Sequence, residues 1–232
     1  PMPLYLGPLS QVTQNQRTGV EVTANASVRV DGEVSFSGYG GVWVSGGGVT
    51  KMSASTVVAD NTLYGAVVSH GGLLEVDGSQ IVRTQAMQGQ GGDGVAVLSR
   101  SALSMANAAV DESSRACVLL DGLDSVDDLD VSDSVMSECQ VGIVVVSQYD
   151  DTELKTEVLE SGNTYQEVEE AILTPGDLGS TDNATGGPAT DCSCEADDPD
   201  FEACMDACEA EADPQLPSTG GSAFGGFSII QE

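Results

Sequence analysis

The sequence predicts an all-β solenoid, a coil of short strands in which each turn stacks on the previous one. Three observations predict it: a short phrase that recurs along the 232 residues, apolar side chains that alternate with period two, and a scarcity of large ones. Hydrophobic residues make up 40% of the chain, yet aromatic residues make up only 4%. Valine and alanine must therefore make up most of the core. Small side chains like these can fill the narrow interior of a coil at normal packing density, which favours a solenoid.

The recurring phrase is a small residue followed by apolar residues at alternate positions. Between its copies lies a second alternating phrase, as in residues 49–52 and 74–76. Both phrases are too short for a helix, and glycine, serine, asparagine and aspartate fill the joints, as turns require. Three strands and three bends in about 22 to 29 residues make one turn of a solenoid. The copies of the first phrase begin at Gly19, Gly41, Gly65, Gly94, Ala116 and Gly142.

These Gly-Val-x-Val and Ser-x-Val phrases resemble the repeats of right-handed parallel β-helix proteins, the pectate-lyase-like superfamily. The resemblance covers about residues 15–176 and implies a right-handed coil of about six to seven turns. A β-sandwich also contains many short strands, but six copies in register favour the solenoid.

Within each copy, alternate side chains should point into the coil and the residues between them should point outward. The inward set is Val42, Val44, Ala66, Val68, Val95, Val97, Cys117, Leu119, Ile143 and Val145. The outward set is Trp43, Val67, Ala96, Val118 and Val144. In a chain with a net charge of -30, this uncharged stripe predicts an interaction face. In the enzymes that the repeats resemble, the corresponding face lines the substrate groove and carries acids and bases.

Composition divides the rest of the chain into segments. Residues 1–14 contain three prolines and are expected to cap the first turn, because proline blocks strand addition. Residues 177–190 have the composition of a linker, and residues 191–213 that of a cysteine-rich loop and helix. The apolar tail, residues 214–232, is predicted to pack on a β-helix, its own or a neighbour's; a frayed terminus is the alternative. Its contact residues would be Phe224, Phe227, Ile229 and Ile230.

Six cysteines in an acidic chain favour an oxidising compartment. Four of them, Cys192, Cys194, Cys204 and Cys208, are predicted to form disulfides that staple a small helical appendage. A four-thiolate zinc site is the alternative, although the spacing fits it poorly. Cys117 and Cys139 stand about one turn apart and either bond across neighbouring turns or remain two separate thiols.

The charge balance restricts the partners. With 37 acidic and 7 basic side chains, neither nucleic acid nor an anionic membrane surface is an expected partner. No apolar run is long enough to span a bilayer. A weak Ca²⁺ site at Asp124, Asp127 and Asp128 is the single cofactor that the sequence suggests, and a solvated acidic surface is the alternative.

No catalytic constellation emerges from the sequence. The basic residues are scattered, His70 stands alone in a turn, and the predicted groove column offers only Glu21 as a carboxylate. The sequence therefore predicts a non-enzymatic β-solenoid, extracellular or in the cell envelope, that is structural, adhesive or self-assembling. Its expected partners are further copies of itself or another surface protein. The alternative is a carbohydrate-active enzyme or glycan-binding domain of the pectate-lyase-like class.

Overall fold

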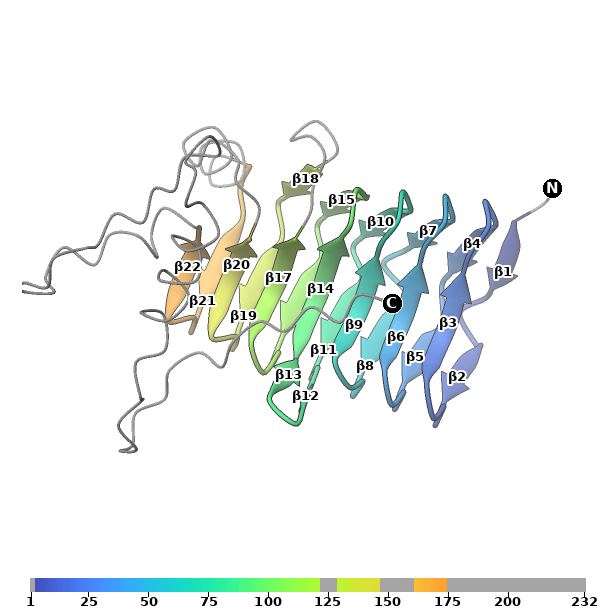
Figure 1. Cartoon of the computed structure of the whole chain (residues 1–232), viewed down its shortest axis with the longest axis horizontal. Helices are drawn as coiled ribbons and strands as arrows, with labels where there is room; N and C mark the ends of the chain where they lie inside the picture. The colour runs from blue at the N-terminus through green and yellow to red at the C-terminus, as the bar shows by residue number, and fades with distance from the viewer. Residues whose placement is uncertain (1–2, 122–128, 147–160, 175–232) are drawn as a thin grey trace, which may run out of the picture. The chain divides into compact units, whose positions relative to one another are not determined.

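The structure is a computed structural model that describes residues 3–121, 129–146 and 161–174 (Figure 1). Every regular element in these three ranges is a β-strand, so the prediction of an all-β fold is confirmed. None of them contains a helix of the length and apolarity that crossing a membrane requires. The chain divides into a first unit, Pro1–Ser180, which holds all the described strands, and a second unit, Thr181–Glu232, which lies outside the described residues.

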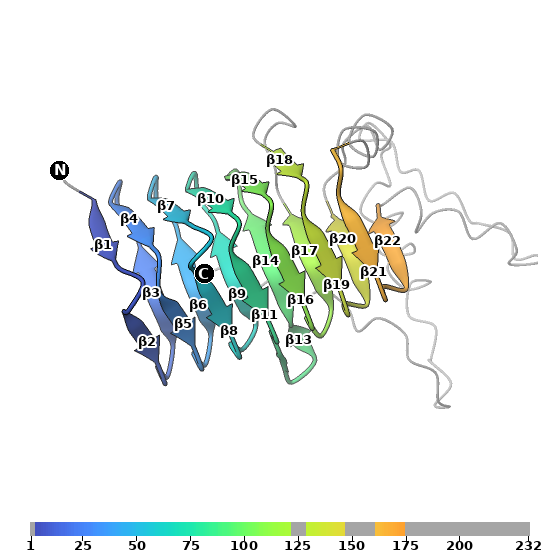
Figure 2. The same ribbon diagram turned by 180° about the vertical axis from the view of Figure 1, so that it is seen from behind.

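The first unit is a parallel β-solenoid of about six turns, and each turn contributes one strand to each of three sheets. Figures 1 and 2 show these strands as parallel rows seen from opposite sides. Sheet 1 contains β3 (Thr18–Val22), β6 (Gly40–Val44), β9 (Tyr64–Val68), β14 (Asp93–Leu98), β17 (Ala116–Asp121), β20 (Val141–Val145) and β22 (Glu170–Leu173).

The other two sheets are built from shorter strands. Sheet 2 contains β1 (Leu4–Leu6), β4 (Ser27–Val30), β7 (Val49–Met52), β10 (Leu73–Asp77), β15 (Ala102–Ala106) and β18 (Leu129–Ser132). Sheet 3 contains β2 (Gln11–Thr13), β5 (Glu33–Ser35), β8 (Val57–Ala59), β11 (Gln80–Val82), β16 (Ala109–Asp111), β19 (Val135–Ser137) and β21 (Thr164–Gln166). A small antiparallel hairpin, β12 (Ala86–Met87) with β13 (Gln90–Gly91), extends the joint before β14.

The coil begins before residue 15, the position at which the repeat phrases predict its start. Strand β1 pairs with β4 and strand β2 pairs with β5, so residues 1–14 supply the first strand of two sheets. Both strands have only three residues, too few to display a repeat phrase. The predicted cap is therefore part of the first turn of the coil.

One column of side chains fills the coil beneath sheet 1. Val44 pairs with Val68, Val68 with Val97, Val97 with Leu120, and Leu120 with Val145. These five side chains are almost completely buried and belong to one continuous hydrophobic cluster. Small branched residues recur at this position because strands of neighbouring turns are only about 4.8 Å apart and the column must pack at core density.

The predicted orientation of β17 is wrong by one residue. Val95 pairs with Val118 and Ala96 pairs with Leu119, so Val118 points into the coil and Leu119 points outward. The reason is Cys117, which occupies the place that Gly94 holds in the preceding turn. At position 94 itself the backbone packs too closely for any larger residue, because a Cβ atom there would lie 2.3 Å from the side chain of Val110.

Cys117 and Cys139 form a disulfide with an S–S distance of 2.05 Å, which confirms the first of the two alternatives. The bond joins residues 22 positions apart and links two consecutive turns. Both cysteines are buried. Cys192, Cys194, Cys204 and Cys208 lie outside the described residues, as do the predicted linker and helical appendage.

Replacing both bonded cysteines, Cys117→Ala with Cys139→Ala, is expected to lower the free energy of unfolding by about 3 kcal/mol. The bond closes a loop of 22 residues and so restricts the unfolded chain. Guanidinium titration of wild type and variant measures the loss. Reductant should destabilise the solenoid of the wild type more than that of the variant, which has already lost this bond; equal stability of the two oxidised proteins would contradict the expectation.

Candidate functional site

The side of sheet 1 that points away from the coil, called the outer face below, carries a second hydrophobic cluster. It is separate from the cluster inside the coil. Along its middle, Trp43 pairs with Val67, Val67 with Ala96, Ala96 with Leu119, and Leu119 with Val144. The cluster continues at the strand starts with Tyr64, Ala116 and Val141. Sheet 1 therefore has apolar side chains on both sides.

Four of the five predicted face residues lie on the outer face, namely Trp43, Val67, Ala96 and Val144. The prediction for Val118 is corrected, because this residue belongs to the inner cluster and Leu119 takes its place. Val67 and Ala96 are 0% exposed, and Leu119 is 4% exposed. The middle of the outer face is thus withdrawn from solvent although it lies on the outside of the coil.

Sheet 2 provides the contrast. Its outward mid-strand residues include Arg29, Lys51 and Glu75, which occupy one register position on adjacent strands. The side chains of Arg29 and Lys51 are 55% and 60% exposed. The same place on a strand is therefore charged and hydrated on sheet 2, and apolar and buried on sheet 1.

A buried ion pair interrupts the apolar cluster at the strand starts. The Nε atom of Arg115 lies 2.8 Å from Oδ1 of Asp93, and Nη2 donates to Oδ2 of the same carboxylate. The backbone N–H of Ala116 also donates to Oδ1, at 3.3 Å. The Asp93 side chain is 0% exposed, and burial raises its pKa, whereas the hydrogen bonds from Arg115 act in the opposite direction.

Sequence reasoning did not find this pair. Its two members stand 22 residues apart, and each lies at or next to the start of a strand, outside the Val-x-Val core of the phrase. The one available signal was a charged residue beside an otherwise uncharged phrase, Asp93 before Gly94 and Arg115 before Ala116. Only the register of the turns brings the two side chains together.

A pocket of about 310 Å³ opens beside Trp43, at the end of the outer face nearest the N-terminus. Trp43 meets Tyr64 edge to face, with ring centroids 6.4 Å apart. An aromatic wall next to charged and hydroxyl groups is an arrangement that can hold a polar ligand with apolar faces. The pocket is lined by Arg17, Glu21, Tyr39, Trp43, Ser69 and His70, among others.

A larger groove of about 470 Å³ follows sheet 2, but its charged groups already have partners. Lys51 forms an ion pair with Glu75. Arg29 contacts both carboxylate oxygens of Asp31, at 3.0 and 3.1 Å, and its guanidinium lies 6.0 Å from the centre of the Tyr5 ring. Ion pairs therefore engage both basic side chains of the groove, Arg29 and Lys51.

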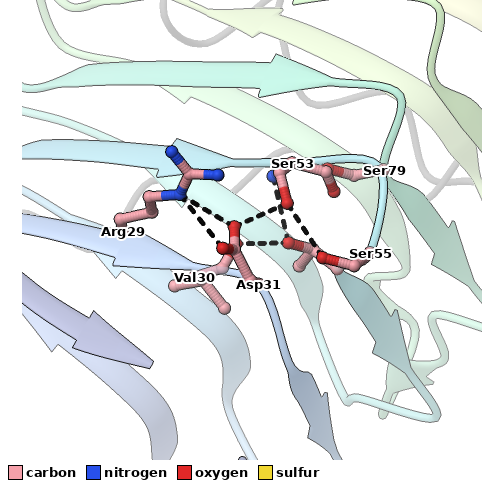
Figure 3. A network of polar contacts seen from close by, with 7 residues as sticks. Arg29, Val30, Asp31, Ser53, Ser55 and Ser79 are labelled. Atoms are coloured by element: carbon pink, nitrogen blue, oxygen red, sulfur yellow. Dashed lines mark hydrogen bonds and ion pairs between the residues drawn. The ribbon is translucent and has the colours of Figure 1, made fainter. Parts of the chain in front are cut away.

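The polar network around Asp31 holds successive turns together (Figure 3). The hydroxyl of Ser53 donates to Asp31 over 2.5 Å, and the Ser79 hydroxyl donates to the carbonyl of Ser53 over 2.9 Å. The Ser53 hydroxyl, followed by Arg29, lowers the pKa of Asp31. Because these residues come from three consecutive turns, the network has a structural role at the corner between sheets 2 and 3.

The residues that the structure describes contain no cluster of side chains suited to bind a metal ion. No group of three or more histidine, cysteine, aspartate or glutamate side chains gathers there in a way that could hold an ion. Asp124, Asp127 and Asp128 fall within residues 122–128, outside the described ranges, so the Ca²⁺ site stays a prediction. Phe224, Phe227, Ile229 and Ile230 also lie outside them.

Comparison of the chain with protein-family models, with curated proteins and with solved structures gives no match. The functional interpretation therefore depends on the geometry of the first unit. Two features of the outer face stand apart from ordinary solenoid construction: the buried apolar cluster with its ion pair, and the aromatic pocket beside Trp43.

Proposed function

We propose that the protein is a non-enzymatic β-solenoid, secreted or displayed on the cell envelope, that acts as an adhesive or self-assembling module through its outer face. The observation that carries the proposal is the apolar column Trp43, Val67, Ala96, Leu119 and Val144. The column lies on the side of sheet 1 that points away from the coil, and contact with other protein surface is the usual reason for apolar side chains there in a protein this acidic. The coil is proposed to be right-handed, as in the pectate-lyase-like proteins that its repeats resemble.

The charged groups on the outer face support a binding role better than a catalytic one. Asp93 is held by Arg115 and is fully buried, so its carboxylate has no open side for a substrate. Glu21 lies at the far end of the column, beside Trp43. The buried Cys117–Cys139 disulfide supports an oxidising location, because such bonds persist mainly outside the reducing cytosol.

The self-assembly proposal predicts an average mass that rises with protein concentration. Leu119→Lys places a charge in the middle of the outer face and is expected to weaken association at least tenfold, since each 1.4 kcal/mol lost at a contact is a factor of ten. Sedimentation equilibrium of the full chain measures it. Ser104→Lys, an outward position on sheet 2, is the matched control and should associate as wild type does.

The self-assembly proposal fails in two cases. One is a wild-type chain that remains monomeric at all concentrations. The other is a Leu119→Lys variant that associates as strongly as wild type, because the contact would then lie elsewhere on the molecule.

Glycan binding is the second candidate function, favoured specifically by the pocket beside Trp43. A sugar ring has apolar faces that stack on an aromatic ring and hydroxyls that bond to charged groups such as Arg17 and Glu21. Trp43 is the sole tryptophan of the chain, so its fluorescence reports directly on this pocket.

A glycan found on an array should change the Trp43 fluorescence, and Trp43→Ala should weaken its binding at least tenfold, a loss of about 1.4 kcal/mol. Tyr5→Ala, which removes an exposed aromatic ring from sheet 2, is the control and should leave binding unchanged. An array on which no glycan binds, or equal binding by the Trp43→Ala variant, would remove this candidate.

A further inference from the structure

The β12–β13 hairpin projects from the coil beside the start of β14, beyond the joints of the neighbouring turns (Figures 1 and 2). Residues 85–90 are all exposed, and Met87 is 37% exposed. The stretch 84–92, Thr-Gln-Ala-Met-Gln-Gly-Gln-Gly-Gly, carries no charge in a chain whose net charge is -30. A second copy can therefore approach the hairpin with less electrostatic repulsion than the acidic surface imposes.

The hairpin is fixed at its base and at its tip. The N–H of Gln85 donates to the carbonyl of Asn61 over 2.9 Å, and the N–H of Leu63 donates to the carbonyl of Gln85 over 2.8 Å. At the tip, Gln88 and Gly89 have φ angles of 54° and 80°, the left-handed pair that a tight two-residue hairpin turn requires. A projection that is already ordered loses little conformational entropy when it binds, so it suits a specific contact.

The pocket beside Trp43 contains polar groups without partners. The Ser69 side chain is 2% exposed, and its buried hydroxyl forms no hydrogen bond with any residue that the structure describes. Arg17 and Glu21 also line the pocket, and neither forms an ion pair within the described ranges. A buried polar group without a partner costs stability, so an incoming group that bonds to Ser69 removes this cost.

The hairpin and the pocket match in chemistry and in size. A methionine thioether packs favourably against an aromatic ring such as that of Trp43. Glutamine amides both donate and accept hydrogen bonds, so Gln88 and Gln90 can satisfy the charged and hydroxyl groups of the pocket. A volume of about 310 Å³ lies at the lower end of the range for ligand sites and suits a few side chains. No residue of the hairpin lines the pocket of its own chain, so a second copy has to supply it.

We propose that the β12–β13 hairpin of one copy inserts Met87 into the pocket beside Trp43 of a second copy. The inference rests on the proposed self-assembly, because the pocket lies at one end of the outer face and the hairpin is what fills it. The projection and the pocket are different parts of one surface, so the contact is head-to-tail. Each copy keeps a hairpin or a pocket for a further neighbour, and repetition of the contact gives rings or filaments.

Two complementary variants test the insertion. Met87→Glu places a negative charge opposite Glu21 and disables the hairpin, and Trp43→Ala removes the aromatic wall and disables the pocket. Each variant alone is expected to need a concentration at least tenfold higher than wild type to associate. An equimolar mixture should form a one-to-one dimer that grows no further, because one variant supplies an intact hairpin and the other an intact pocket. Sedimentation equilibrium of the full chains measures both results.

Matched controls separate the contact from charge and from folding. Gln80→Glu adds the same charge at an exposed position of sheet 3 and should associate as wild type does. Arg17→Glu changes an exposed pocket residue, leaves the Trp43 packing intact and should replace Trp43→Ala in the mixture with the same result. Emission from Trp43, the single tryptophan, should change with protein concentration in wild type and stay constant in Met87→Glu.

The insertion and the self-assembly proposal fail in different ways. If Leu119→Lys weakens association and Met87→Glu does not, the outer face remains the contact and the insertion is overturned. Two weak variants whose mixture does not recover also overturn it, because damage to one shared face gives that result. A wild-type chain that is monomeric at all concentrations removes both proposals. If Trp43 emission responds to a glycan and not to protein concentration, the pocket is a glycan site and the insertion is overturned.

Discussion

Val118→Lys is expected to prevent folding at neutral pH, whereas Leu119→Lys should leave the solenoid intact. Val118 is completely buried inside the coil, between Val95 and Ile143 of the neighbouring turns. A lysine there either carries an unpaired charge or loses its proton, and the pKa of a buried lysine falls by about 3 to 5 units. At pH 7 the cost of removing the proton from a lysine of ordinary pKa limits this loss to about 4 to 5 kcal/mol, and the excess volume of the side chain adds about 1 to 3 kcal/mol; together they are comparable with the whole stability of many domains.

Leu119 is the matched comparison because it is the next residue on the same strand and points outward. A lysine at this position can extend its charged end past the surrounding side chains into water. Circular dichroism during urea unfolding measures both variants. If Val118→Lys folds and Leu119→Lys does not, Val118 must point outward and Leu119 inward, which would contradict the register of β17.

Arg115→Met is expected to destabilise the protein by about 3 to 5 kcal/mol at pH 7, the usual cost when one member of a buried ion pair is removed. The variant leaves the Asp93 carboxylate buried without its arginine, so the pKa of Asp93 in the folded state rises further above its unfolded value. A group with a raised folded pKa destabilises the fold above that pKa and ceases to do so as pH falls through it. The deficit relative to wild type should therefore shrink as the pH is lowered from 7 towards the unfolded pKa of aspartate, about 3.9.

The double variant Asp93→Asn with Arg115→Met separates charge from packing. An amide at position 93 carries no charge, so this protein should regain much of the lost stability at pH 7 and should lack the added pH dependence. Urea titrations of the three proteins at pH 5 and pH 7 provide the comparison. A deficit of Arg115→Met that does not change with pH would show that the loss comes from packing of the arginine stem.

The inner column was predictable because the physical constraint repeats with every turn. Val44, Val68, Val97 and Val145 each follow a glycine phrase, and a period-two pattern then fixes which side chains point inward. The outward positions Trp43, Val67, Ala96 and Val144 follow from the same alternation.

The same reasoning failed in β17 because one residue type changed. Elsewhere the position before the inward valine is glycine, as at Gly94, and the Ala116-Cys117 pair offers no glycine to align. Aligning Ala116 instead of Cys117 with Gly94 shifts the alternation by one residue. Leu119 is then predicted to point inward and Val118 outward, the reverse of their actual orientations. A one-residue shift reverses every side chain of a strand, so a single substitution at the joint altered the predicted face.

The ion pair and the polar corner needed the three-dimensional register. Asp93 with Arg115, and Asp31 with Ser53, each join residues 22 positions apart, about one turn of the coil. The repeat phrases align the apolar positions of successive turns, but they do not show which polar side chains at the joints face each other. The first strands β1 and β2 were missed for a related reason, since three residues carry too little pattern.

Methyl-to-methyl nuclear Overhauser contacts test the stacked coil most directly, because they report side chains that touch across neighbouring strands. The structure predicts an unbroken series of cross-peaks from Val44 to Val68, Val97, Leu120 and Val145. Leu119 should instead show contacts with Ala96 and Val144 on the outer face. Cross-peaks from Val97 to Leu119 in place of Leu120, or a series that breaks between turns, would contradict the winding of the chain and the outer face that depends on it.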